Sequence, residues 1–286
     1  AVQESPNRGL DSGKETMMGD YVYCLHPLVV IMSNSANLLK GKKVIVIGGS
    51  SGIGRSVAAA ALSNGASVVI SSSSQQKIDA AVERLRQSSN GVADITVKGC
   101  AFDLKDLEAL KAFLDKEGPF DHLAITAGTI KGLQRFPKVG VTERLKSEFD
   151  LRYYAVITAA QHIYNNKLIN PGGSIIMTIG TSHYQSLPGW GLLSGVIGAV
   201  EGSTRGLAVD LKPIRVNTIA PGVVDTEIFD GLSPERKKEI IEERTKALPV
   251  GHVGTPEEVA EAYMFAMKCT YLTGQVIVVD GGQTVV

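Results

Sequence analysis

The clearest chemical signal in the chain is a glycine-rich string, "IGGSSGIG", at residues 47–54. It stands between an apolar run, "KVIVI" at 43–47, and a helical stretch that begins near Ile53. Glycines at such a turn let the backbone approach a pyrophosphate, and amides at a helix N-terminus stabilise its charge. A tight turn without a ligand could use the same glycines, but the strand before and the helix after favour a nucleotide site.

The second apolar run, at 67–71, leads into "SSSS" at 71–74. An acid at this distance past the glycines would accept from a ribose 2′-hydroxyl and repel a 2′-phosphate. Ser72 occupies that place, and Arg55 or Lys77 could supply positive charge. The pattern predicts NADP(H) rather than NAD(H), although four serines could also form a simple polar loop.

Five ordered motifs resemble the short-chain dehydrogenase/reductase family over residues 40–286. They are Gly48-x-x-x-Gly52-x-Gly54, "FDL" at 102–104, "TAG" at 126–128, "IRVNTIAPGVVDT" at 214–226 and "YLTGQVIVVDGG" at 271–282. The resemblance implies that Asp103 and Leu104 flank an adenine, and that Val224 and Thr226 lie near a nicotinamide amide. The predicted NADP(H) contacts are Gly48, Ser50, Ser51, Gly52, Ile53, Gly54, Arg55, Ser72, Ser73, Ser74, Asp103, Leu104, Ala127, Gly128, Thr129, Arg152, Pro221, Gly222, Val224 and Thr226.

The same resemblance exposes a missing proton relay. The family reduces carbonyls with an Asn, a Ser, a Tyr and a Lys. Alignment of the flanking motifs places other residues there, namely Arg152, Gly180, Leu193 and Ile197. A shift of one residue would bring Thr181 to the Ser position, but no shift supplies the Tyr and Lys.

Two explanations follow from the missing relay: a non-catalytic NADP(H)-binding regulator or scaffold, or a reductase whose substrate needs no enzymic proton. An imine or iminium carbon is already activated, and a cyclisation requires positioning rather than a titrating group. The chain resembles the fungal imine reductase/Diels–Alderases of indole alkaloid pathways in having Arg152 and Trp190, while Leu187 stands where an acid is expected. A reductase of a bulky or pre-activated substrate in specialised metabolism is the favoured hypothesis. Coupling of the reduction to a cyclisation such as a Diels–Alder step, and a cofactor-assisted isomerase or cyclase, stay open as alternatives.

Arg152 and Trp190 are therefore the predicted catalytic residues, and no metal ligands are predicted. Arg152 could instead form a surface ion pair, and Trp190 could simply pack at the start of a helix. His183 and Tyr184 lie on a loop where an acid could be recruited, although exposed loop residues without a role are expected more often. Ile228 and Phe229 belong to a segment that usually closes over substrate in the family.

Around these residues, short β-branched runs alternate with helical stretches, which is typical of a parallel sheet. The expected fold is α/β: a Rossmann-type, doubly wound, seven-stranded parallel sheet in three α/β/α layers, as one domain at 40–286. Strands are expected at 43–47, 67–71, 94–99, 121–126, 174–179, 214–220 and within 274–282. Helices are expected at about 53–64, 75–87, 105–116, 141–166, 191–210, 234–246 and 256–268.

Composition narrows the class of partner. Lys plus Arg and Asp plus Glu both number 29, so no net charge recruits nucleic acid or an anionic membrane. Residues 1–39 are expected to form a partly flexible extension, and their apolar part is too short to span a bilayer. Three distant cysteines favour a reducing, cytoplasmic setting. The expected partners are a small hydrophobic substrate and, from the family resemblance, further copies of the chain as a homodimer or homotetramer.

Overall fold

A computed structural model of the chain describes residues 38–88, 95–128 and 135–286, with the side chain of Ile228 excepted. The predicted extension lies almost wholly outside the described residues, so its boundary at residue 39 stays a prediction. No helix in the described ranges is both long and apolar enough to cross a bilayer.

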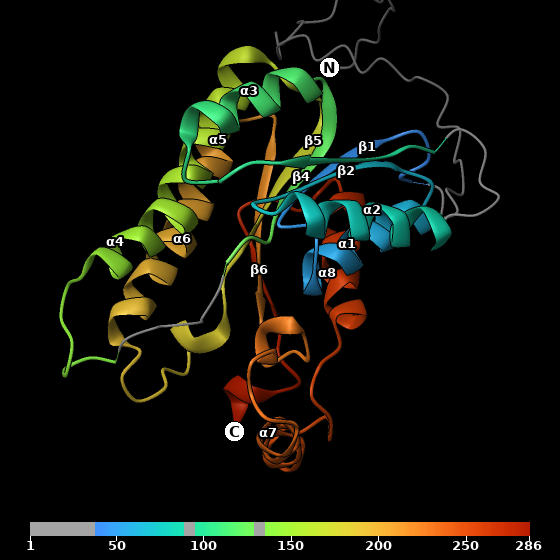
Figure 1. Cartoon of the computed structure of the whole chain (residues 1–286). Coiled ribbons are helices and arrows are strands. Elements are labelled where there is room, and N and C mark those ends of the chain that lie inside the picture. The colour runs from blue at the N-terminus through green and yellow to red at the C-terminus, as the bar shows by residue number, and fades with distance from the viewer. Residues whose placement is uncertain (1–37, 89–94, 129–134) are drawn as a thin grey trace, which may run out of the picture. The chain divides into compact units, whose positions relative to one another are not determined.

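Seven parallel strands form one sheet in the order β3-β2-β1-β4-β5-β6-β7 (Figure 1). The strands are β1 Lys43–Ile47, β2 Ser67–Ser72, β3 Val97–Ala101, β4 Phe120–Ile125, β5 Ile169–Thr178, β6 Arg215–Pro221 and β7 Val276–Val279. From β1 the chain proceeds outward through β2 to β3 and then returns to β4 on the other side of β1. The order therefore reverses between β1 and β4, and in such sheets ligands bind at the carboxyl ends of the strands around that point.

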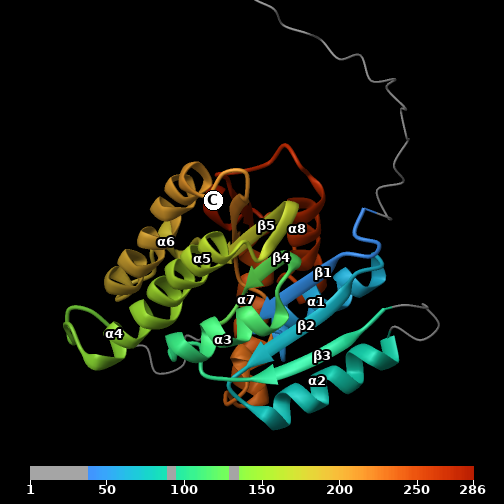
Figure 2. The ribbon, with the colours of Figure 1, turned by 90° about the horizontal axis from the view of Figure 1, so that it is seen from above.

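Helices cover both faces of the sheet (Figures 1 and 2). They are α1 Gly52–Ser63, α2 Gln75–Ser88, α3 Leu107–Glu117, α4 Glu143–Phe149, α5 Ala155–Asn166, α6 Gly191–Asp210, α7 Pro234–Ala247 and α8 Pro256–Lys268. Along β1, Val44 and Val46 belong to the core shared with α1, α2 and α8, whereas Ile45 and Ile47 belong to the core shared with α3, α5 and α6. This alternation explains why the strand reads as an unbroken apolar run. The α/β/α expectation is confirmed.

The prediction differs most from the structure in three elements, and the bounds of the others agree to within two residues. The helix expected at 141–166 consists of α4 and α5 joined by a π-helical turn, Asp150–Tyr154. β3 begins at Val97, later than the expected 94, and residues 89–94 lie outside the described ranges. β5 begins at Ile169, because its first residue pairs with Phe120 before a register shift, although "NPGG" reads as a turn.

The charge-dense helix α7 buries none of its residues and lies beyond the carboxyl ends of the strands, at the lower end of the molecule in Figure 1. Ser233 caps it by accepting from the N–H of Arg236. Its polar surface agrees with the solvated face predicted from the sequence, but two of its residues, Ile240 and Arg244, reach a cleft described next.

Candidate active site

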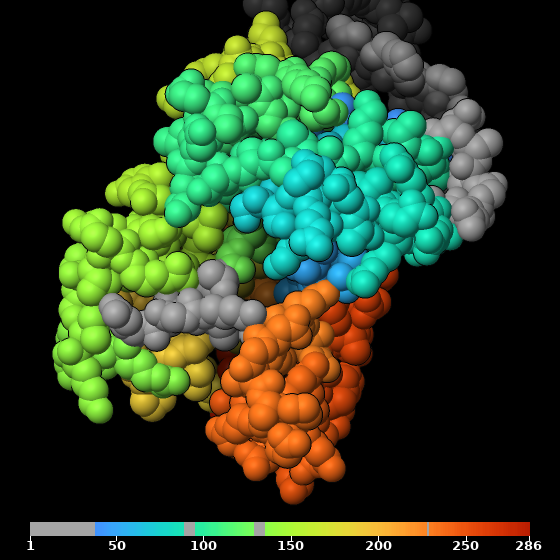
Figure 3. Space-filling view, in the orientation of Figure 1, coloured from blue at the N-terminus to red at the C-terminus, as the bar shows by residue number. Residues whose placement is uncertain are grey.

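A cleft of about 1050 Å³ opens at the carboxyl ends of the strands. Small-molecule sites are commonly about 300–1,000 Å³, so this space suits a large cofactor together with a substrate. Figure 3 shows the surface hollowed between the cyan residues of α2 and the orange residues of α7. The cleft lies at the reversal of strand order, as the topology predicts.

The glycine turn forms the floor of the cleft next to β1. Gly48 has a φ of +90°, and a Cβ there would lie 2.6 Å from the backbone nitrogen of Ala127. A Cβ on Gly54 would lie 2.2 Å from the carbonyl oxygen of Gly48 and 2.4 Å from Oγ1 of Thr126. Only glycine fits either position, and the backbone is left open to a ligand.

All but one of the predicted cofactor residues line this cleft. They are Gly48, Ser50, Ser51, Gly52, Ile53, Gly54, Arg55, Ser72, Ser73, Ser74, Asp103, Leu104, Ala127, Gly128, Arg152, Pro221, Gly222, Val224 and Thr226. The exception, Thr129, lies outside the described residues. The structure thus brings together residues that span most of the chain.

The serine loop after β2 forms one end of the cleft. Oγ of Ser71 is buried and has no hydrogen-bond partner in the part of the chain that the structure describes. Lys77, Arg84 and Lys105 add positive charge along the same wall. Sequence reasoning missed Arg84, although its spacing of seven residues from Lys77 puts both on one face of α2.

Arg55, the alternative source of charge for a 2′-phosphate, lines the same cleft as the serine loop, and this role stays a prediction. Its guanidinium forms an ion pair with Glu227, 2.8 Å between Nη1 and Oε1. Burial raises the pKa of Glu227, but hydrogen bonds from its own backbone N–H, from Arg55 and from Gly52 outweigh burial, so the pKa is lowered overall. Glu227, which no local sequence pattern marks as a site residue, is therefore ionised at neutral pH.

Arg152 lies on the π-helical turn between α4 and α5, a local geometry that often occurs at functional sites. Its Nε donates to Oε2 of Glu148 at 2.7 Å, and Arg144 reaches the other carboxylate oxygen at 2.7 Å. Glu148 is fully buried. A Cβ on Gly128 would lie 2.5–2.9 Å from three atoms of the Arg152 guanidinium, so the guanidinium packs against that glycine. Arg152 thus forms both the ion pair and part of the cleft wall.

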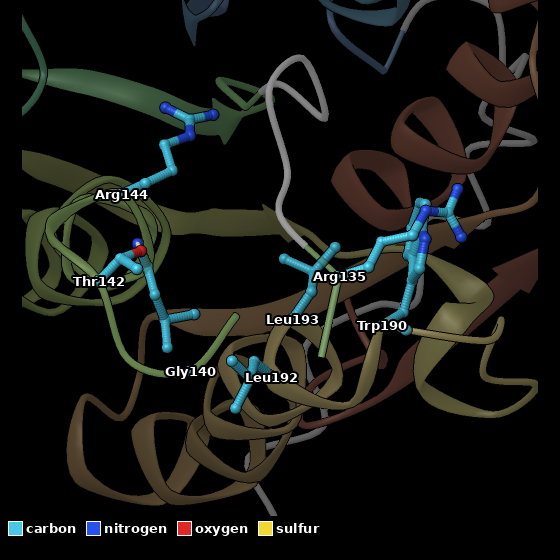
Figure 4. A pocket seen from close by; sticks show the side chains of 9 residues that line it. Arg135, Gly140, Thr142, Arg144, Trp190, Leu192 and Leu193 are labelled. Carbon is cyan, nitrogen blue, oxygen red and sulfur yellow. Dashed lines mark hydrogen bonds between the residues drawn. The ribbon is translucent and has the colours of Figure 1, made fainter. Parts of the chain in front are cut away.

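Trp190 precedes α6 and lines the cleft together with Leu193 and Ile197. The side chains of Leu193 and Ile197 are each only 5% exposed. Trp190 and Leu193 also line a second pocket, of about 30 Å³. In Figure 4, Arg135 and Trp190 lie on one side of this pocket, and Thr142 and Arg144 lie on the other. Arg135 donates to the carbonyl of Pro188 at 2.8 Å, which ties this wall to the segment before α6. Trp190 and Leu193 therefore separate the small pocket from the main cleft.

The loop after β5 supplies hydroxyls but no recruited acid. Thr178, Thr181 and Ser182 line the cleft. Oγ1 of Thr178 donates to the carbonyl of Ile125 and shares a 2.6 Å hydrogen bond with the buried Tyr263, whose pKa is raised by burial. Gly180 lines the cleft as well.

His183 and Tyr184, by contrast, are not among the described residues that line the cleft. His183 instead pairs with Glu201 of α6 at 2.9 Å. Burial and the neighbouring Glu201 raise the pKa of Tyr184. The loop therefore directs both titratable side chains toward α6.

The segment after β6 closes another side of the cleft. Phe229 lines it as expected, whereas the side chain of Ile228 lies outside the described residues. Near the C-terminus, Gln283 also lines the cleft and is only 9% exposed. Its Oε1 is buried with no hydrogen-bond partner in the described ranges. Sequence reasoning missed Gln283, since nothing in its neighbourhood marks a site.

Titratable side chains are not spread evenly over the lining of the cleft. Among the described residues that line the cleft there is no tyrosine, histidine or cysteine, and the two lysines belong to the serine-loop end. Within residues 38–88, 95–128 and 135–286, no group of three or more His, Cys, Asp or Glu side chains could hold a metal ion. The acids on the lining are Asp103, Glu227 and Asp230.

Comparison with known proteins gives a consistent result. A family model described as an SDR-like Rossmann domain matches residues 35–286. The short-chain dehydrogenase/reductase malC of Malbranchea aurantiaca is 33% identical over 256 residues, covering 87% of this chain and 96% of the relative. A second relative, the short-chain dehydrogenase/reductase fsr5 of Gibberella fujikuroi, is 35% identical over 256 residues, covering 85% and 95%.

Two solved structures are also similar. The MalC reductase/Diels–Alderase of Malbranchea aurantiaca superposes with a TM-score of 0.81 at 31% identity, covering 88% of this chain and all of that one. A small-chain dehydrogenase in complex with NADPH gives a TM-score of 0.70 at 28% identity, covering 86% and 100%.

Proposed function

The chain belongs to the short-chain dehydrogenase/reductase family, and from this premise we propose that it is an NADP(H)-dependent reductase with a non-standard active site. Its substrate is a bulky, pre-activated molecule of the imine or iminium type from specialised metabolism, and reduction is coupled to a Diels–Alder-type cyclisation. The observation that carries the proposal is the contrast within one cleft: an intact glycine turn faces Leu193 and Ile197 rather than a tyrosine and a lysine.

NADP(H) fits the residues that are present. The open glycine turn and the N-terminus of α1 would hold the pyrophosphate. Ser72 would hold the 2′-phosphate, next to the buried hydroxyl of Ser71, which has no partner among the described residues. Lys77 and Arg84 would add positive charge. The similar dehydrogenase solved with NADPH supports this choice. When bound, the cofactor supplies a hydride.

The apolar wall determines which acceptors suit the site. A ketone needs a proton as the hydride arrives, and general acid catalysis contributes roughly 10²–10⁴ in rate. Leu193 and Ile197 cannot donate one. An iminium carbon carries its activation with it and becomes a neutral amine on hydride addition. The apolar lining of Trp190, Leu193 and Ile197 therefore favours a substrate of that kind.

The charge of Arg152 is partly compensated, which reduces its repulsion of a cationic substrate. Its guanidinium pairs with the buried carboxylate of Glu148, which Arg144 also contacts, so two arginines share one carboxylate. We assign Arg152 and Trp190 the role of holding the substrate beside Gly128: the guanidinium orients a carbonyl, and the indole forms an apolar wall. Orientation of this kind lowers the barrier to a cyclisation without proton transfer. Similarity to a reductase/Diels–Alderase supports the coupled cyclisation.

The test follows NADPH absorbance with a panel of cyclic imines and a panel of ketones. We expect consumption with imines only, and a loss of at least about tenfold in Arg152→Ala and in Trp190→Phe. Arg205→Ala is the matched control, because Arg205 is an exposed arginine of α6 that does not line the cleft. Tight NADPH binding with no consumption by either panel would favour the non-catalytic regulator.

We propose a homodimer or homotetramer, by analogy with the usual assembly of the family. Exposed apolar side chains on and beside α5 and α6, including Tyr154, Tyr164 and Val209, are available for such an interface. Light scattering after size exclusion measures the mass directly, and a monomer would contradict this part.

A further inference from the structure

The carboxylate of Glu227 lies at the N-terminus of α1, next to the glycine turn. The backbone N–H of Gly52 donates to Oε2 at 2.8 Å, and Nη1 of Arg55 donates to Oε1 at 2.8 Å. Glu227, Gly52 and Arg55 all line the cleft. The two oxygens of one carboxylate therefore occupy two donors of the phosphate-binding turn.

This contact differs from the N-termini of other helices in the chain. α3, α4, α7 and α8 are each capped by the side chain of their own N-cap residue, namely Asp106, Thr142, Ser233 and Thr255. Ser51, the N-cap residue of α1, makes no such hydrogen bond. The first N–H of α1 is satisfied instead by an acid 175 residues away in sequence.

We propose that Glu227 is an internal competitor for the pyrophosphate of the cofactor and thereby sets cofactor affinity. The inference rests on the proposed function, because it takes the glycine turn to be the pyrophosphate site. A carboxylate and a phosphate are both anionic acceptors that favour a helix N-terminus and an arginine. They cannot share the N–H of Gly52, so the side chain of Glu227 must leave before a phosphate takes its place. The measured affinity is reduced by the fraction of molecules in which the carboxylate is in place.

Displacement of Glu227 has consequences on both sides of it. Arg55 loses its partner and becomes a donor for the incoming phosphate. Thr226, which precedes Glu227, and Phe229, two residues after it, both line the cleft. Asp225 forms an ion pair with Lys237 of α7 at 2.8 Å. Cofactor binding therefore moves a segment that shapes the substrate end of the cleft. Through Glu227, binding of the cofactor would change the shape of the part of the cleft that holds the substrate.

The test measures NADP⁺ binding by calorimetry to the full chain and to Glu227→Gln, a substitution that keeps the shape and removes the charge. We expect about tenfold tighter binding, the size expected for loss of a competing charge-assisted hydrogen bond. Glu227→Ala should bind NADP⁺ at least as tightly. The double variant Arg55→Ala/Glu227→Gln should bind NADP⁺ less tightly than Glu227→Gln alone, because the freed guanidinium is no longer present to donate to the phosphate.

Two controls isolate the mechanism. Glu239→Gln on α7 removes an exposed charge that does not line the cleft, and it should leave NADP⁺ affinity unchanged. Adenosine 2′-monophosphate has no group for the pyrophosphate site, so it should bind the wild type and Glu227→Gln equally.

The outcomes separate this inference from the proposed function. Equal or weaker NADP⁺ binding by both Glu227 variants would overturn the competitor role while leaving the cofactor assignment intact. Absence of NADP⁺ binding in every variant, wild type included, would overturn the cofactor assignment as well.

Discussion

The two halves of the cleft have opposite character. The half built by β1, β2 and α2 carries glycines, serines, Lys77 and Arg84. The half built by α6 and the segment before it presents Trp190, Leu193 and Ile197. Both halves rest on the same sheet, so the difference does not come from the fold. In the function we propose, the first half binds the nucleotide, and the described residues of the second half offer Leu193 and Ile197 in place of a tyrosine and a lysine that would supply a proton.

Gly54→Ala should cause the largest loss of NADP⁺ affinity, because it alters the glycine turn of the nucleotide-binding half. Its Cβ would lie 2.2 Å from the carbonyl oxygen of Gly48, so the turn must move. We expect NADP⁺ affinity to fall by at least about a hundredfold, measured by calorimetry. Gly195→Ala is the matched control, since a Cβ there meets nothing within 4 Å and alanine favours a helix. Unchanged affinity in Gly54→Ala would exclude this turn as the binding site.

Ser72→Asp should reverse the cofactor preference without disturbing the turn. A carboxylate there repels a 2′-phosphate, and we expect NADP⁺ to bind about fiftyfold more weakly while NAD⁺ binds more tightly. Gln87→Glu, which adds the same charge on the exposed side of α2, should change neither affinity. If NAD⁺ already binds the wild type more tightly than NADP⁺, the assignment of this half is wrong.

Leu193→Tyr combined with Ile197→Lys tests the α6 half of the cleft by adding a proton donor to it. Both residues line the cleft, one helical turn apart on α6. A restored proton donor should raise ketone reduction by about tenfold, below the full range for general acids because the new side chains are not ideally supported. Leu193→Phe with Ile197→Met tests for effects of bulk alone. Equal ketone rates in the two double variants would contradict the role assigned to the missing relay.

Arg84→Ala should have the smallest effect. This exposed cation lines the serine-loop end of the cleft, and loss of one such charge should weaken NADP⁺ binding about threefold and leave NAD⁺ unaffected. Arg86→Ala lies on the same helix but off the cleft, where its side chain donates to the carbonyl of Val97. Arg86→Ala should not change the ratio of the NADP⁺ and NAD⁺ affinities. A larger loss of NADP⁺ affinity in Arg86→Ala than in Arg84→Ala would show that Arg84 is not the cation that assists NADP⁺ binding.

Local patterns predicted most of the fold. The bounds of α6 and α8 agree with the sequence prediction at both ends. α6 is a long, mostly apolar stretch, and α8 begins at an N-cap threonine followed by a proline. The π-helical turn at Asp150–Tyr154 carries no comparable signal. Its position depends on how α4 and α5 pack.

The cleft lining followed from motif spacing, and two of the residues that were missed share one property. Glu227 meets Gly52 across 175 residues, and Gln283 reaches the cleft from the end of the chain. Such contacts arise only after the sheet has assembled, so no window of sequence contains them. The ion pair of Arg152 with Glu148 is local in sequence, at a spacing of four residues. What the sequence did not show there is that Glu148 is buried.

The most direct test of the central claim is transfer of deuterium from NADPH labelled at the nicotinamide C4 to a cyclic imine, followed by mass spectrometry of the amine. We predict deuterium at the former imine carbon in the wild type and no labelled alcohol from a matched ketone. Labelled alcohol formed as readily as labelled amine would contradict a site without a proton donor. NADPH binding with no label in either product would show that the cleft keeps the cofactor without the chemistry.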